Sequence, residues 1–278
     1  MNTSVHANFH ALGLSEALLK DLADAGFASP TPIQEQAIPP ALAGRDVIGC
    51  AQTGTGKTAA FVIPIVERLA ALPKGQPQAL ILAPTRELAL QTLTTIEKLG
   101  RSRRISATVI VGGADMQAQV RGLRQRPDIL IATPGRLLDH MWNGTIVLSS
   151  MKILVLDEAD RMLDMGFAPQ INQILDALPE ERQTLLFSAT LPTDLARLVQ
   201  ANVKNPVRVM VAPSATTADG VTQGIHYTSH AEKPDLLLSL LKADQDTALV
   251  FTRTKHRADR LGRMLGGAGH RVAVLHGD

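Results

Sequence analysis

Short, almost wholly apolar runs alternate along the chain with longer segments of helical periodicity. The runs are four or five residues long and occupy residues 46–49, 79–83, 107–111, 128–132, 152–156, 184–187 and 207–211. Apolar runs of this length are typical of strands that are buried on both faces, as in a parallel sheet covered by helices. The alternation therefore predicts an α/β fold.

The segments between the runs have helical patterns of their own, and the first of them precedes the first predicted strand. Leu18, Leu22 and Ala25 share one face at helical spacing. Ser15 can cap the amino terminus of this helix, and Gly26 can end it. We therefore predict a helix from residue 15 to residue 25.

The composition becomes small and polar around residues 212–220, which is typical of a linker. We predict a first domain at residues 1–211, a linker at 212–223 and a second domain at 224–278. The second domain is predicted to contain strands at 224–228, 247–251 and 271–275 and helices at 234–241 and 256–265. Three strands bury little apolar surface, so we expect this domain to be a truncated unit.

Composition narrows the function further. The chain has 278 residues and a formal net charge of only +2, so any nucleic-acid contact must come from locally placed Lys and Arg. Its single cysteine, Cys50, excludes an intramolecular disulfide and a Cys-rich zinc site. We expect a cytoplasmic protein, because a lone cysteine suits a reducing compartment and no signal peptide or bilayer-length apolar run is evident.

Residues 51–58, Ala-Gln-Thr-Gly-Thr-Gly-Lys-Thr, follow a predicted strand and lead into a helical segment, as a phosphate-binding loop does. Lys57 can supply a positive charge to the β- and γ-phosphates of a nucleotide, and the Thr58 hydroxyl can ligate Mg²⁺. Ala51 stands where the general pattern has its first glycine, which is tolerated if its φ is negative. The alternative is a flexible turn without a ligand. The candidate nucleotide-binding residues here are Gln52, Thr53, Gly54, Thr55, Gly56, Lys57 and Thr58.

The apolar run at 152–156 ends in the acidic tetrapeptide of residues 157–160. A strand of a parallel sheet delivers such residues to the edge where the phosphate loop also opens. Asp157 can hold Mg²⁺, and Glu158 can orient and deprotonate an attacking water. Glu158, Lys57 and Asp157 are therefore the candidate catalytic residues. Taken alone, an acidic tetrapeptide is more often a solvated helix start.

Asp157-Glu158-Ala159-Asp160 spells the DEAD box, and across nearly its whole length the chain resembles bacterial DEAD-box ATP-dependent RNA helicases. The resemblance implies a RecA-like lobe followed by part of a second one, with ATP and Mg²⁺ as cofactors. Phe9, Phe27 and Gln34 resemble the Q motif, which reads adenine in that family. Without the resemblance, a buried Phe and a helix-start Gln would be the default.

A further motif of the resemblance is Ser188-Ala189-Thr190, which in the family couples the ATP state to closure of the two lobes. The two hydroxyls can hydrogen-bond the acidic cluster, so Asp160, Ser188 and Thr190 are candidate coupling residues. Read alone, this tripeptide is more often a helix cap.

Three segments that follow predicted strands resemble the RNA-gripping motifs of the family. Each offers hydroxyls, backbone N–H groups or an Arg, and helix N-termini and Arg both suit phosphate. Each one alone could be an ordinary turn, and the other Arg clusters read as solvated faces. Aromatic residues are scarce, so sugar-phosphate contacts should dominate. The candidate RNA-binding residues are Pro84, Thr85, Arg86, Gly112, Gly113, Thr133, Pro134, Gly135, Arg136 and, in the second domain, Thr254 and Gly277.

The sequence contains no His-Arg-x-Gly-Arg-x-x-Arg run, which supplies arginine fingers in the family. We therefore expect this chain to bind ATP or ADP but to hydrolyse ATP weakly. The resemblance implies RNA as the main partner, ribonucleoprotein or RNA-decay proteins as further partners, and no membrane. Two alternatives stay open, an ATP-gated RNA clamp or scaffold without unwinding and a nucleotide-binding regulator without nucleic acid. Preference for DNA is a weaker variant.

Overall fold

The computed structural model describes residues 8–192, 195, 202–211, 222, 224–243 and 246–276. The chain divides into two compact units, Met1–Ala215 and Thr216–Asp278. The division falls within the segment that the composition predicts to be a linker, although most of that segment lies outside the described residues. Within the described part of the chain, no helix has the length and apolar character needed to cross a bilayer.

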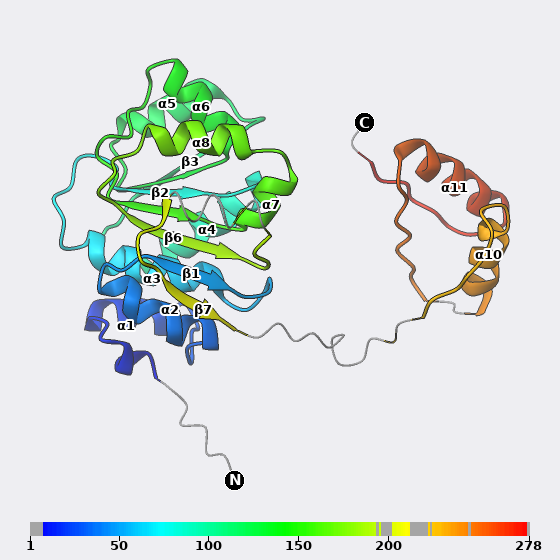
Figure 1. The fold of residues 1–278 in the computed structure, drawn as a ribbon, viewed down its shortest axis with the longest axis horizontal. Coiled ribbons are helices and arrows are strands. Elements are labelled where there is room, and N and C mark those ends of the chain that lie inside the picture. The colour runs from blue at the N-terminus through cyan, green and yellow to red at the C-terminus, as the bar shows by residue number, and fades with distance from the viewer. Residues whose placement is uncertain are drawn as a thin grey trace, which may run out of the picture. The chain divides into compact units, whose positions relative to one another are not determined.

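The first unit is built on a seven-stranded parallel sheet with the order β3-β4-β2-β5-β6-β1-β7 (Figure 1). All seven predicted strands are present, with bounds that differ from the predicted ones by one residue at most, so the α/β prediction is confirmed. The strands are β1 (Val47–Cys50), β2 (Ala79–Leu82), β3 (Ala107–Ile110), β4 (Ile129–Ala132), β5 (Ile153–Leu156), β6 (Gln183–Ser188) and β7 (Val207–Met210).

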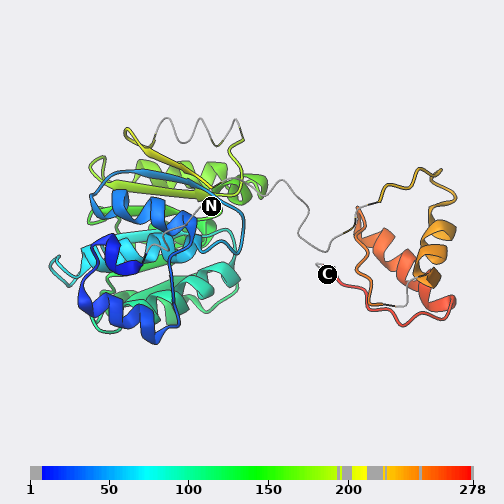
Figure 2. The same ribbon diagram turned by 90° about the horizontal axis from the view of Figure 1, so that it is seen from below.

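Successive strand residues point to opposite sides of the sheet, so both faces carry apolar side chains. Helices cover both of these faces (Figures 1 and 2). On β5, Ile153 and Val155 belong to one hydrophobic core, and Leu154 and Leu156 belong to the other. The first core is closed by η1 (Phe9–Leu12), α1 (Glu16–Asp24), α2 (Pro32–Leu42), α3 (Lys57–Leu69) and α4 (Arg86–Leu99). The second is closed by α6 (Pro134–Trp142), α7 (Ala159–Asp164) and α8 (Ala168–Asp176), with α5 (Met116–Arg124) beside β3.

The first helix begins and ends as the sequence predicts. The Ser15 hydroxyl accepts a hydrogen bond from the Leu18 N–H at 3.4 Å. Gly26 follows the helix at φ +84°, in the left-handed region that favours glycine. Helix α1 packs against α4 through its buried face, which holds Leu18 and Leu22.

The described residues of the second unit form two helices, α10 (Lys233–Ala243) and α11 (Lys255–Gly267), which confirms both predicted helices. The three strands predicted for it are wrong, because the described residues of those ranges form no strand. Their apolar side chains stand in solvent, with Tyr227 94% exposed, Phe251 87% and Leu275 98%. A strand needs a hydrogen-bonded partner, and three short segments beside two helices bury too little apolar surface to maintain a ladder.

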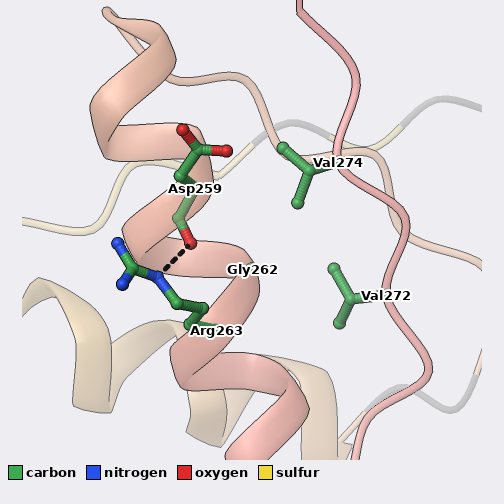
Figure 3. Close-up of a pocket in the computed structure, with 5 residues that line it drawn as sticks. All are labelled: Asp259, Gly262, Arg263, Val272 and Val274. Carbon is green, nitrogen blue, oxygen red and sulfur yellow. Dashed lines mark hydrogen bonds between the residues drawn. The ribbon is translucent and has the colours of Figure 1, made fainter.

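A glycine on α11 lets the chain after this helix pack against it. A Cβ atom at Gly262 would collide with the Val274 side chain. Figure 3 shows Gly262 facing Val272 and Val274 across a pocket that Asp259 and Arg263 also line. The Arg263 Nε donates to the Asp259 carbonyl at 3.4 Å along the helix. The segment that follows α11 therefore packs closely against this helix.

Candidate functional site

The predicted site segments that follow strands of the first unit lie at the edge of the sheet where the parallel strands end, whereas Phe9, Phe27 and Gln34 precede β1. In chain order the predicted nucleotide segments follow β1, β5 and β6, and the predicted RNA segments follow β2, β3 and β4. In sheet order these strands form two adjacent triplets, β3-β4-β2 and β5-β6-β1. The predicted nucleotide residues and the predicted RNA residues therefore occupy two halves of this edge that meet between β2 and β5, and we call these the nucleotide half and the RNA half.

The phosphate loop curls between β1 and α3. Gly54 at φ +85° and Gly56 at φ +91° take the left-handed conformations that other residues adopt only with strain. The buried Lys57 donates from its Nζ to the Ala51 carbonyl at 2.6 Å, so the ammonium sits inside the loop. Ala51 is not among the described residues with a positive φ, so the condition for an alanine at this position is met.

Gln34 connects the start of α2 to this loop. Its Nε2 donates to the Gly56 carbonyl at 3.0 Å, and its Oε1 accepts from the Thr31 N–H at 3.0 Å. A Cβ at position 56 would collide with the Gln34 amide, so glycine is required there for packing as well as for conformation. Adenine recognition by Gln34 stays a prediction. Gln34 also forms a capping box with Thr31 at the start of α2, and the Thr-x-x-Gln spacing in the sequence is the signal for that contact.

The two aromatic residues of the predicted adenine site contact each other. Phe9 is buried in the first core, and its ring meets the Phe27 ring edge to face at a centroid distance of 6.4 Å. Phe27 is only half-buried. Phe9 therefore supports the Phe27 ring, part of which stays exposed. Stacking of Phe27 on adenine stays a prediction.

The acidic residues after β5 have contrasting surroundings. Burial raises the pKa of Asp157 to about 7, since the nearby positive charge of Lys57 only partly offsets the desolvation and Glu158 adds a negative charge. Asp157 and the Thr58 hydroxyl offer two oxygen ligands, and the described residues hold no cluster of three or more His, Cys, Asp or Glu side chains suited to a metal. This donor set fits Mg²⁺ that is shared with nucleotide phosphates, because Mg²⁺ is commonly bound by one or two carboxylates together with phosphates and water.

Glu158 lies at the start of α7 with φ +49° and ψ +51°, which is unusual for a residue other than glycine. Its Oε2 accepts from the Arg161 Nη1 at 3.2 Å. Sequence reasoning missed Arg161, although the spacing of three residues at a helix start indicates such a pair. The ion pair sets the direction of the carboxylate that is predicted to act on water.

Asp160, Ser188 and Thr190 lie in hydrogen-bond contact. The Asp160 Oδ2 accepts from the Thr190 N–H at 2.9 Å and from the Thr190 hydroxyl at 2.8 Å. The Ser188 hydroxyl donates to the Thr190 carbonyl at 2.6 Å and accepts from the Asp160 N–H at 3.4 Å. Burial alone would raise the pKa of Asp160, but the hydrogen bonds from Thr190 and Ser188 hold it below its usual value. The coupling role of this cluster stays a prediction.

Two helices begin at the RNA half. Thr85 caps α4 by accepting from the Leu88 N–H at 3.3 Å, and the next residue, Arg86, is exposed. Thr133 precedes α6 without a side-chain cap, and Pro134 is its first residue. The first backbone N–H groups of a helix have no partner within the helix, so each of these helix starts is suited to bind a phosphate.

The turn of Gly112 and Gly113 lies beside these helices. Gly113 has φ +71°, both glycines are exposed, and a Cβ on either would meet nothing within 4 Å. The carbonyls on either side of the pair are held, since Val111 O accepts from the Gln119 Nε2 at 3.0 Å and Ala114 O accepts from the Arg136 Nη1 at 2.9 Å. Arg136, predicted to contact RNA, is therefore engaged with the turn.

The remaining predicted RNA residues belong to the second unit. Thr254 caps α11 by accepting from the Arg257 N–H at 3.3 Å. Gly277 lies outside the described residues. Contact of either residue with RNA stays a prediction.

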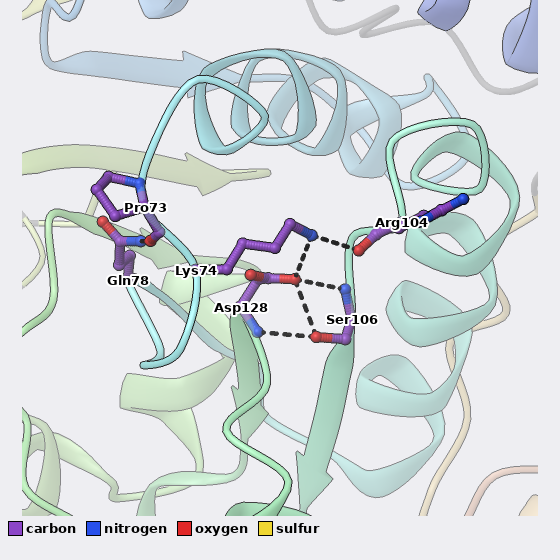
Figure 4. A network of polar contacts seen from close by, with 6 residues as sticks. All are labelled: Pro73, Lys74, Gln78, Arg104, Ser106 and Asp128. Atoms are coloured by element: carbon purple, nitrogen blue, oxygen red, sulfur yellow. Dashed lines mark hydrogen bonds and ion pairs between the residues drawn. The ribbon is translucent and has the colours of Figure 1, made fainter.

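The opposite edge of the sheet, where β3 and β4 begin, holds a polar network that contains no predicted site residue (Figure 4). The Asp128 Oδ2 accepts from the Ser106 N–H at 2.8 Å, from the Ser106 hydroxyl at 2.9 Å and from the Lys74 Nζ at 3.3 Å. Lys74 also donates to the Arg104 carbonyl. These contacts join the ends of neighbouring strands, so this edge serves the fold.

Comparisons with known proteins agree with this geometry. A family model for DEAD/DEAH box helicases matches residues 31–198. The DEAD-box ATP-dependent RNA helicase RhpA of Helicobacter pylori (strain B128) is 45% identical over 272 residues, which cover 98% of this chain and 55% of that protein. The ATP-dependent RNA helicase CshA of Limosilactobacillus reuteri is 45% identical over 271 residues, with coverage of 97% and 54%. This chain thus spans about half the length of these relatives.

A solved structure gives the same result for the fold. The crystal structure of a DEAD box protein from the hyperthermophile Methanococcus jannaschii matches with a TM-score of 0.69 and 35% sequence identity, and the match covers 97% of this chain and 73% of that one. Since the family model covers more than half of the sequence and these relatives match nearly all of it, the chain belongs to the DEAD/DEAH box helicase family.

Proposed function

We propose that this chain binds ATP in the nucleotide half of the sheet edge and RNA in the RNA half, and that it forms the ATP-dependent part of an RNA helicase. The observation that carries the proposal is the strand order, which gathers each class of predicted residue into one adjacent triplet of strands. The ATP-dependent RNA helicases that match nearly the whole chain support the same conclusion.

At the nucleotide half, the glycine-rich loop presents backbone N–H groups to the phosphates. Lys57 exchanges its contact with the Ala51 carbonyl for phosphate oxygens, and Thr58 and Asp157 hold Mg²⁺. Bound Mg²⁺ supplies positive charge that neutralises the phosphate oxygens during phosphoryl transfer. Phe27, supported by Phe9, stacks on the adenine ring.

Hydrolysis needs a group that accepts a proton from the attacking water, and Glu158 is placed to do so. Its Oε2 accepts from the Arg161 Nη1, and this contact orients the carboxylate. Asp160 links the state of the nucleotide to Thr190 and Ser188 through its hydrogen bonds. In a longer protein, with the second lobe completed, this contact would bias closure of the two lobes.

At the RNA half, the starts of α4 and α6 and the glycine turn contact the sugar-phosphate backbone of one strand. Arg86 adds a charge-assisted contact. Contacts of this kind give little sequence preference and a strong dependence on salt.

Turnover by this chain alone should be slow. The sequence has no His-Arg-x-Gly-Arg-x-x-Arg run, so transition-state charge on the γ-phosphate lacks the support that arginine fingers provide.

The test is steady-state ATP hydrolysis with and without single-stranded RNA, on this chain and on the longer protein, each beside its Glu158→Gln variant. We expect RNA to stimulate the longer protein, Glu158→Gln to abolish that activity, and this chain to stay near background. ATP-dependent RNA binding without multiple turnover in the longer protein would favour a clamp. Nucleotide binding that ignores RNA would favour a regulator, and an equal response to DNA strands would remove the preference for RNA.

A further inference from the structure

A chain of buried polar side chains lies beneath the glycine turn. Gln119 on α5 is 7% exposed, and His140 on α6 is fully buried. The His140 Nε2 lies 3.2 Å from the Gln119 Oε1, and its Nδ1 lies 2.8 Å from the Thr145 hydroxyl. Gln119 then donates from its Nε2 to the Val111 carbonyl, the last residue before the two glycines.

The donors and acceptors in this row of side chains determine where its hydrogen atoms lie. Because the Gln119 Nε2 faces a carbonyl, its Oε1 faces the ring and can only accept, so the His140 Nε2 carries the proton. The Nδ1 is then an acceptor beside the Thr145 hydroxyl, whose one hydrogen is shared between this nitrogen and the His140 carbonyl 2.9 Å away. Each donor meets an acceptor with a neutral imidazole, and burial lowers the pKa of His140, with Arg136 lowering it further and Asp139 opposing.

Helix α6 therefore holds both carbonyls that flank the glycine pair. It holds Ala114 O directly through Arg136, and it holds Val111 O through His140 and Gln119. The start of the same helix is the second backbone element predicted to bind phosphate. The turn and the helix start are thus fixed relative to each other.

We propose that Gln119 and His140 are positioning residues for RNA binding, which hold the Gly112–Gly113 turn in register with the start of α6 so that both meet one RNA strand. The inference rests on the proposed function. Fixing both elements beforehand removes the cost of ordering them when the strand binds. Gln119 touches no RNA in this scheme, so its effect passes through the turn.

The chain offers a matched control for the substitution that tests this. Gln119→Met removes the donor to Val111 while it keeps an unbranched side chain of similar length. Gln78→Met removes another buried glutamine, whose Nε2 donates to the Pro73 carbonyl at 2.6 Å at the opposite edge of the sheet. Gln119→Met loses two buried hydrogen bonds, to Val111 and from His140, and Gln78→Met loses one, so both should melt at a lower temperature.

The measurement is the Kd for a labelled single-stranded oligonucleotide, beside the Kd for ATP and the melting temperature, on the whole chain at low salt. We expect Gln119→Met to weaken RNA binding about tenfold while ATP affinity is unchanged. Gln78→Met should leave both affinities unchanged. Wild-type RNA affinity in a folded Gln119→Met variant, or an equal loss in Gln78→Met, would overturn the positioning role. Failure of the wild-type chain to bind RNA would instead overturn the proposed function, and the positioning role with it.

A second pair of variants covers the case in which Gln119→Met does not fold. Thr145 is only half-buried, so substitutions there are milder. Thr145→Val removes the hydroxyl that lies 2.8 Å from the His140 Nδ1 and that donates to the His140 carbonyl, so the ring that supports Gln119 loses its second anchor. RNA affinity should fall in Thr145→Val and be retained in Thr145→Ser. Equal RNA affinity in these two variants would contradict the proposal.

Discussion

Glu158 occupies a backbone conformation that is costly for a residue with a side chain. A non-glycine residue in the left-handed region typically costs on the order of 1 kcal/mol or more, and such residues gather at functional sites. Glu158 takes this conformation between the end of β5 and the start of α7, where it accepts from Arg161. Stability is thereby given up for the direction of one side chain.

Replacing this residue should separate stability from activity. Glu158→Gly relieves the strain but loses the contact with Arg161, which is half-exposed and contributes little. We expect the free energy of unfolding to rise by about 1 kcal/mol while ATP hydrolysis is lost. Chemical denaturation measures the first effect, and phosphate release measures the second. Glu158→Gln, which keeps the strain, is the control, and a Gly variant less stable than the Gln variant would contradict the account.

Asp157 should make the stability of the first unit depend on pH. Its pKa is raised from 3.8 to about 7 in the folded chain, so the folded state holds a proton that the unfolded state has lost. The contribution of Asp157 to stability is thus fully present below pH 3.8 and is lost as the pH rises through 7. Asp157→Asn cannot ionise and escapes this loss.

Without divalent cations, the advantage in unfolding free energy of Asp157→Asn over the wild type should therefore grow between pH 5 and pH 8. Its expected size is on the order of 3 kcal/mol. Thermal or urea unfolding across this range measures it. A difference between the two proteins that stays constant with pH would show that Asp157 is not buried as described.

The side chains of the candidate site divide into those that a local pattern reveals and those that it does not. Lys57, Thr58 and the acidic residues were predictable, because a strand, a turn and a helix lie next to each other in the sequence. The chain from Gln119 to His140 was not predictable, since it depends on how α5 and α6 pack. The same holds for the engagement of Arg136 with the glycine turn, which links two segments 22 residues apart.

Among the elements, the seven strands of the first unit were predictable because most of them are short apolar runs and helical patterns lie between them. The strand order was not, since the apolar runs carry no information about their neighbours. The strands expected in the second unit failed for the same reason. An apolar run shows that a segment can form a strand, whereas pairing requires partners that the described residues of this unit do not provide.

The polar network at the start of β3 and β4 should matter for stability alone. Asp128 is 5% exposed and accepts from Ser106 and Lys74, so Asp128→Ala removes three hydrogen bonds made by a buried carboxylate. We expect the free energy of unfolding to fall by about 2–3 kcal/mol. ATP and RNA affinities of the folded variant should not change. A change in either affinity, measured by titration below the melting temperature, would show that the two edges of the sheet are coupled.

At the scale of the whole molecule, the modest net charge means that RNA affinity must depend on a few placed cations. Arg86→Ala should lower the slope of log Kd against log salt concentration by about one, because one phosphate contact is lost. Arg121 on α5, an exposed residue 3.8 Å from Asp115, is the control, and its replacement by Ala should leave the slope unchanged. An unchanged slope in Arg86→Ala would remove this residue from the RNA contacts.

The strand order has a consequence for how such proteins diversify. Strands β2, β3 and β4, with the helices that follow them, form one uninterrupted stretch of sequence, whereas β1, β5 and β6 lie on either side of it. Two crossovers, one before β2 and one before β5, would exchange the whole proposed RNA-binding half and leave every nucleotide-binding residue in place. RNA preference can therefore be inherited as a single cassette, carried on an ATP site that does not have to be rebuilt.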